Sequence, residues 1–167
     1  MRNRDWKDQV TIYEATVKTN PQSAALRNDL GIVYFQYGEL VKSRESFEKA
    51  IAMNPRDPHF YFSAEETYSA LEQYDKTIEC LNKAIELKPD FPEAYFNLAG
   101  IHAYLNKETQ AREYLAKAVD MYRQEGRILE AGEAIKSMEK YFSRQQAQAK
   151  LGEESSPDDV SQEKSAQ

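Results

Sequence analysis

Cysteine, glycine and proline are scarce in this sequence, and their scarcity narrows the choice of fold. The 167 residues include one cysteine, six glycines and six prolines. The single cysteine, Cys80, cannot form a disulfide within the chain or a cysteine-rich metal site, and its helical context indicates an inert thiol. So few glycines and prolines argue against a loop-rich β-fold and against a low-complexity chain. The length fits one domain with a packed core.

Long apolar runs and an excess of basic residues are missing as well. No apolar run is long enough to span a bilayer, and the start, MRNRDWKDQV, lacks the apolar segment of a signal peptide. The net charge is −6, and Gly152–Gln167 holds five acids against one lysine, which leaves −2 for the rest. This distribution argues against nucleic-acid binding. We expect no membrane insertion by this chain and, by default, a cytoplasmic location.

Motifs of catalysis, cofactor binding and metal binding are not found. The sequence has no glycine-rich phosphate loop, no nucleophile elbow and no His-x-x-x-His helix. His59 and His102 lie far apart in the sequence, and neither has a neighbouring ligand motif. We therefore expect no catalytic residues, no cofactor and no metal, and the chain is not predicted to be an enzyme.

A regular repeat is the strongest signal that the sequence contains. Three similar segments end in Pro21, Pro55 and Pro89, which are 34 residues apart. This period divides the chain into repeats at 24–57, 58–91 and 92–125. Within each repeat, large and small apolar residues alternate as two packed helices require, and the proline ends the second helix.

The equivalent positions of the three repeats carry similar residues. In repeat order they are Arg27, Tyr61 and Tyr95; Leu30, Ala64 and Leu98; Gly31, Glu65 and Ala99; Tyr34, Tyr68 and His102; Ser43, Thr77 and Ala111; Phe47, Leu81 and Leu115; and Ala50, Ala84 and Ala118. This pattern resembles the tetratricopeptide repeat (TPR). The resemblance implies an all-α fold, in which antiparallel helix pairs stack into a right-handed superhelical solenoid.

A few residues depart from the family pattern. Arg27 replaces an aromatic residue, His102 replaces a tyrosine, and Arg123 stands where a fourth proline would be. Glu65 replaces a small residue at the contact between the two helices of its repeat. We expect its carboxylate to reach outward to solvent, since its long side chain does not fit between closely packed helices.

The segments that flank the repeats are incomplete units. Residues 1–23 correspond to the turn and second helix of an earlier repeat, a half repeat that includes Trp6 and Tyr13. Residues 126–149 have one apolar stripe and are predicted to form a capping helix; the stripe consists of Ile128, Ala131, Ile135, Met138 and Phe142. Residues 150–167 are predicted to be an acidic disordered tail.

The first helices of TPR pairs line a concave groove, so the resemblance also implies a binding surface. We predict a groove that takes a protein or peptide segment with apolar and basic residues, with Phe35, Phe62, Phe96 and Tyr104 as an aromatic strip. The predicted groove residues are Asn28, Ile32, Phe35, Gln36, His59, Phe62, Glu66, Glu93, Phe96 and Tyr104. Phe62 and Phe96 are as consistent with packing between repeats as with a free groove surface.

Three functions remain open at this stage. The first is a non-catalytic scaffold for protein–protein interaction, and the second is a secretion or assembly chaperone. The third is an accessory domain of a membrane protein, which would be associated with a membrane or extracytoplasmic. It rests on RNRDWKD, which resembles the junction before the C-terminal TPR modules of multispanning, mannosyltransferase-like membrane proteins. Binding of a C-terminal carboxylate, as in chaperone-binding TPR domains, is rejected because all five clamp positions differ; they are Asn28, Ile32, Ser63, Glu93 and Asn97.

Overall fold

The computed structural model describes residues 2–154, and the side chains of residues 7–148. This described part consists of eight α-helices and contains no β-strand. The side chain of Trp6 and residues 155–167, most of the predicted tail, lie outside it. The helices are α1 (Arg2–Thr19), α2 (Ala24–Gln36), α3 (Leu40–Met53), α4 (Pro58–Ala70), α5 (Tyr74–Leu87), α6 (Pro92–Tyr104), α7 (Glu108–Gln124) and α8 (Ile128–Glu154).

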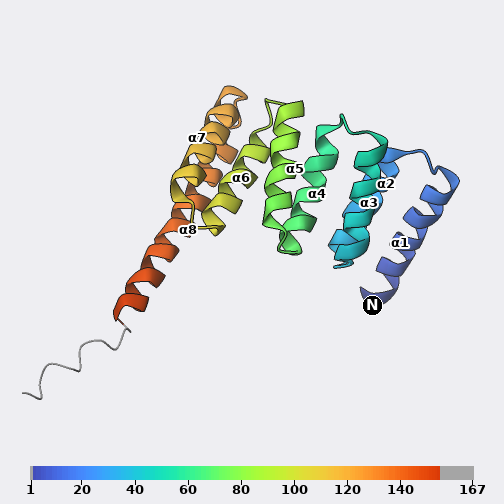
Figure 1. The fold of residues 1–167 in the computed structure, drawn as a ribbon, viewed down its shortest axis with the longest axis horizontal. Helices are drawn as coiled ribbons and strands as arrows, with labels where there is room; N and C mark the ends of the chain where they lie inside the picture. The colour runs from blue at the N-terminus through green and yellow to red at the C-terminus, as the bar shows by residue number, and fades with distance from the viewer. Residues whose placement is uncertain (1, 155–167) are drawn as a thin grey trace, which may run out of the picture.

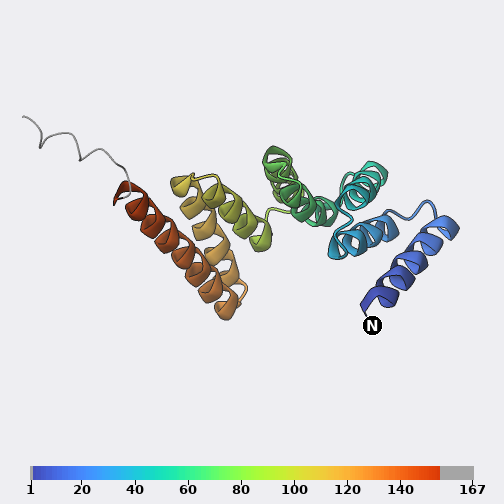
Figure 2. The same ribbon diagram turned by 90° about the horizontal axis from the view of Figure 1, so that it is seen from below.

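The helices stack in the order of the sequence along the long axis of the molecule (Figures 1 and 2). The pairs α2–α3, α4–α5 and α6–α7 are the three predicted repeats, and α1 precedes them as the predicted half repeat. Capping residues begin α2 and α4. Ser23 Oγ accepts a hydrogen bond from the Leu26 amide, and Asp57 caps α4 ahead of Pro58. The all-α solenoid predicted from the 34-residue period is thus confirmed.

The turn between the two helices of a pair has the same backbone in all three repeats. Gly38, Glu72 and Asn106 have φ values of 77°, 58° and 57°, and they are spaced by the repeat period. Only glycine adopts this left-handed conformation without a steric penalty. Because a glutamate and an asparagine adopt the same conformation, the packing of the two helices, rather than the identity of the turn residue, determines the backbone of the turn.

Small residues bring the two helices of a pair into close contact, as the sequence predicts. A Cβ atom at Gly31 would lie 2.8 Å from the ring of Phe47, so α2 and α3 could not approach as closely with any larger residue. Ser43 Oγ donates to the Gly31 carbonyl over 2.8 Å and also contacts the hydroxyl of Thr67 on α4 at 2.8 Å. In the third repeat, the fully buried Ala99 and Ala111 belong to one cluster.

A tyrosine–glutamate hydrogen bond recurs between successive repeats. The Tyr34 hydroxyl on α2 donates to Glu14 on α1, and the Tyr68 hydroxyl on α4 donates to Glu48 on α3. The third equivalent position is His102, whose ring stacks on a tyrosine of α7. The buried Nδ1 of His102 has no hydrogen-bond partner in the described part of the chain. The same bond therefore crosses the first two stacking interfaces and is missing from the third.

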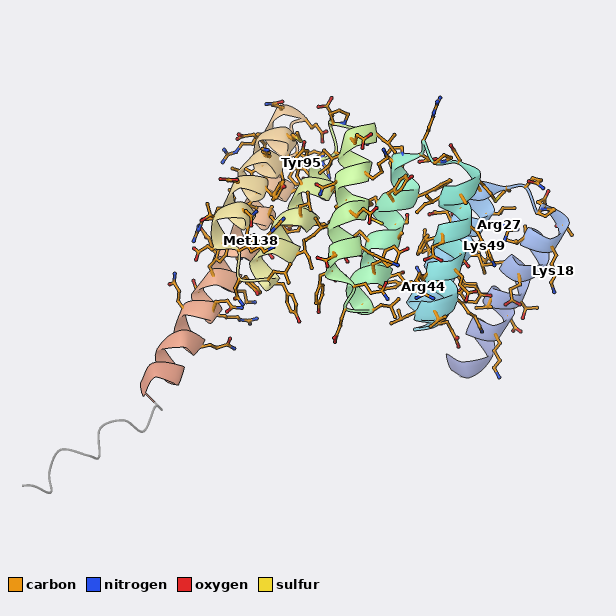
Figure 3. All side chains as sticks on the ribbon, viewed as in Figure 1. Lys18, Arg27, Arg44, Lys49, Tyr95 and Met138 are labelled. Carbon is orange, nitrogen blue, oxygen red and sulfur yellow. The ribbon has the colours of Figure 1, made fainter. Side chains whose placement is uncertain are left out.

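Helix α8 covers the end of the array, although its bounds and its apolar face differ from the prediction. It continues to Glu154, five residues past the predicted limit of 149. Met138, labelled in Figure 3, and Phe142 are buried in a cluster with residues of α6 and α7, but Ile128 is 62% exposed. Ala134 takes part in the buried face instead, where it packs together with Ala131 against Ala118, Val119 and Tyr122 of α7. None of the helices within residues 2–154 combines the length and hydropathy needed to cross a bilayer.

Candidate functional site

The first helices of the repeats, α2, α4 and α6, carry all ten predicted groove residues, but they bring only some of them together. Between α2 and α4 lies a hollow of about 190 Å³. Four of the predicted residues line it: Ile32, Phe35, Phe62 and Glu66. The fully buried Phe47 and the neighbouring Ser63 and Glu65 complete its wall. This hollow offers an apolar surface with a carboxylate at its edge.

A second hollow, of about 360 Å³, lies between α4, α5 and α6. Its rim is formed by Tyr104, which is 55% exposed, and by Tyr74, the first residue of α5. The two rings lie 5.1 Å apart, and the Tyr74 hydroxyl donates to the Tyr104 hydroxyl over 3.1 Å. Sequence reasoning missed Tyr74 because it considered only the first helix of each pair. Gly100 leaves the hollow open, since an added Cβ there would have no neighbour within 4 Å.

Glu65 lines both hollows. Its side chain is buried and does not reach solvent, so the expectation from the sequence was wrong. It is only 5% exposed, and Asn97 Nδ2 on α6 donates to its Oε1 over 2.5 Å. Burial raises the pKa of Glu65 to about 7, an effect opposed by the Asn97 hydrogen bond and reinforced by the charge of Glu66. The side chain turns toward α6 rather than outward because the Asn97 amide provides a hydrogen-bond donor there.

Three predicted groove residues serve the packing of the fold instead. Asn28 is buried, and Phe96 packs into the two apolar clusters that α8 forms with α6 and α7. Glu93 pairs with Arg127, 2.6 Å away at the start of α8. Phe96 stays half-buried, as Phe35 and Phe62 are, but it lines neither hollow, so the predicted aromatic strip is not continuous. Gln36 and His59 are exposed but line neither hollow.

A larger hollow, of about 930 Å³, lies on the second helices of the repeats, between α3 and α5. Its apolar lining includes Ile51, Tyr61 and Ile78, and several carboxylates surround it. Sequence reasoning missed this hollow, although the half-buried isoleucines on α3 and α5 were a signal for it. Cys80 also lines it, and burial raises the pKa of its thiol to about 12, in keeping with the predicted inert thiol.

Pairs of antiparallel helices stacked one after another define the class of α-solenoid repeat proteins. Comparison with family models identifies the kind of repeat. Two models described as tetratricopeptide repeat match residues 1–58 and 92–125, and one described as TPR repeat matches residues 66–105. The chain belongs to the tetratricopeptide repeat proteins.

Solved structures of other proteins have the same fold. A MamA fragment from Desulfovibrio magneticus RS-1 is 22% identical, with a TM-score of 0.67, over 72% of this chain and 68% of that one. A crystal structure of MamA is 19% identical, with a TM-score of 0.65, over 87% and 92% of the two chains. The Cut9–Hcn1 hetero-tetramer of APC/C is 20% identical, with a TM-score of 0.65, over 70% of this chain and 22% of that one. The search of curated proteins gave no match. The repeat family and this fold support a general role as a protein-interaction scaffold.

Proposed function

We propose that the chain is a non-catalytic scaffold that binds an extended or helical segment of a partner protein along α2, α4 and α6. The observation that carries the proposal is the pair of adjoining hollows, which meet at Glu65. Together they form a groove that we define by Ile32, Phe35, Phe62, Glu65, Tyr74 and Tyr104. The groove is shorter than the one expected from the sequence, since Phe96 lines neither hollow.

The chemistry of the groove favours a segment with apolar anchors. Phe35 and Phe62 are half-buried, so their rings keep surface that a partner side chain can cover. Large aromatic anchors of this kind dominate the binding energy of many interfaces. The carboxylates of Glu65 and Glu66 on the same wall favour a basic residue next to the apolar ones.

The experiment is a binding screen on an array of short synthetic peptides that combine phenylalanine or leucine with lysine or arginine. Phe35→Ala and Phe62→Ala should each weaken the binding of selected peptides by about 1–3 kcal/mol, because an anchor loses buried aromatic area. Fluorescence anisotropy with labelled peptides measures the affinity. Far-UV circular dichroism verifies that each variant is folded.

The control variant is Ile78→Ala, which removes a similar apolar area from the separate hollow between α3 and α5. It should bind the selected peptides like the unaltered protein. Loss of binding in Ile78→Ala with retention in Phe35→Ala would refute the proposal and place the partner on the second helices. The roles as a membrane-protein accessory domain or a chaperone remain predictions from the sequence.

A further inference from the structure

The middle of the groove contains a buried carboxylate at a position where the neighbouring repeats have Gly31 and Ala99. Glu65 is 5% exposed, and the side chains around it give it one hydrogen bond, from Asn97. Taking a carboxylate out of water is unfavourable unless a cation or several donors compensate it. Among the described ion pairs, none includes Glu65. A small apolar residue would satisfy the packing here without this penalty.

The surroundings of Glu65 increase its need for a positive partner. Glu66, which follows it on α4, is the only charged group whose field shifts its pKa, and that field is repulsive. The other titratable groups near it are Cys80 and Tyr74 on α5 and Tyr104 on α6, and none of these carries a positive charge. The helices packed against α4 therefore provide Glu65 with an amide donor but no cation.

Space for such a cation exists next to the carboxylate. The lining of the hollow between α4, α5 and α6 includes Glu65, Asn97, Tyr74 and Tyr104. Gly100 leaves it open. Its volume of about 360 Å³ suits a long side chain, whose alkyl part can lie along the tyrosine rings.

We infer that Glu65 is the specificity-determining residue of the groove, and that it binds the ammonium or guanidinium group of a lysine or arginine from the partner segment. The apolar neighbours of that residue occupy the hollow formed by Ile32, Phe35 and Phe62. This inference rests on the proposed function, because it names the class of segment that the same groove selects.

The inference implies that binding depends on pH. A carboxyl group with a pKa of about 7 is mostly neutral at pH 6 and mostly ionised at pH 8. Only the ionised form attracts a cation. If that form binds a lysine-containing segment about ten times more tightly than the neutral form does, the affinity should rise about fivefold between these two pH values. Lysine and arginine stay charged throughout this range, so the change belongs to the protein.

The test uses matched peptide pairs in which one central lysine is replaced by norleucine, which keeps the alkyl chain and removes the charge. At pH 8 the unaltered protein should prefer the lysine peptide by about tenfold, the size expected for a hydrogen bond to a charged group. Glu65→Gln should abolish both this preference and the pH dependence while it retains the hydrogen bond with Asn97. The matched control Glu79→Gln removes one charge outside the groove, at the hollow between α3 and α5, and should retain both.

The possible outcomes separate this inference from the proposed function. If peptides bind and depend on Phe35, but the lysine preference survives in Glu65→Gln, the inference is wrong and the groove function stands. If no peptide of the array binds, or if binding does not depend on Phe35, the proposed function fails and the inference fails with it. Loss of the preference in Glu65→Gln alone, with circular dichroism unchanged, supports both.

Discussion

Replacing Glu65 by glutamine should stabilise the protein at alkaline pH and leave its stability nearly unchanged under acidic conditions. Burial raises the pKa of Glu65 to about 7, against 4.5 for an exposed glutamate. The folded protein therefore binds the proton more tightly than the unfolded chain does. The stability that this proton contributes is fully present below pH 4.5 and is lost as the pH rises through 7.

The size of the effect follows from the shift in pKa. Each pKa unit corresponds to about 1.4 kcal/mol, so the full shift amounts to about 3 kcal/mol between pH 4.5 and pH 8. Glutamine has the shape of a protonated glutamate and can accept the same hydrogen bond from Asn97. Glu65→Gln should therefore avoid this loss, and the free energy of unfolding at pH 8 should exceed that of the unaltered protein by about 1–3 kcal/mol.

The assay is urea denaturation followed by far-UV circular dichroism, in small pH steps from 5 to 8.5. The difference between the two proteins removes the contributions of all other titrating groups. Glu79→Gln, which changes an exposed carboxylate on α5 outside the groove, is the control and should give a curve nearly parallel to that of the unaltered protein. If Glu65→Gln also runs parallel to it across this range, the carboxylate is not destabilised by burial, and the reasoning about its partner loses its basis.

Three further predictions concern the core and the thiol. Ala84→Leu should lower the free energy of unfolding by about 1–3 kcal/mol in urea titrations, because Ala84 is fully buried and the core has no room for a larger side chain. In the same titrations, Phe47→Ala should lower the free energy of unfolding by about 3–5 kcal/mol, because Phe47 is 1% exposed. Phe35→Ala should lower it clearly less, because Phe35 is only half-buried. Equal losses would contradict the assignment of Phe35 to the groove. At about pH 8, Cys80 should react with Ellman's reagent much more slowly in the native protein than in urea, because burial raises the pKa of its thiol to about 12. Equal rates would show that the thiol is accessible.

The repeat period determined which parts of the fold were predictable. Residues such as Leu30, Phe47 and Ala84 recur at the spacing of packed helix pairs, and each is buried as that spacing requires. The turn at Gly38 could be expected from the glycine itself. The same backbone at Glu72 could not, because there the packing of helices overrides the local preference of the residue; asparagine, as at Asn106, tolerates this conformation.

The groove was less predictable, since it depends on contacts between segments that the repeat pattern does not relate. The pattern assigns Phe96 and Glu93 to the groove, but Phe96 packs with residues of α8 and Glu93 pairs with Arg127. The burial of Glu65 depends on the hydrogen bond from Asn97, which belongs to the next repeat. Such pairings arise from the stacking of the helices in three dimensions. They cannot be predicted by comparing equivalent positions of the three repeats.

The missing tyrosine–glutamate bond at His102 has a consequence for the elasticity of the solenoid. The first two stacking interfaces are joined by Tyr34–Glu14 and Tyr68–Glu48, while His102 provides no such connection. Between the second and third repeats, the hydrogen bonds from Asn97 to Glu65 and from Tyr74 to Tyr104 cross on the groove side instead. The stiffness of this joint should therefore change with the protonation of Glu65. The curvature of the solenoid would then respond to the proton or cation that its groove holds.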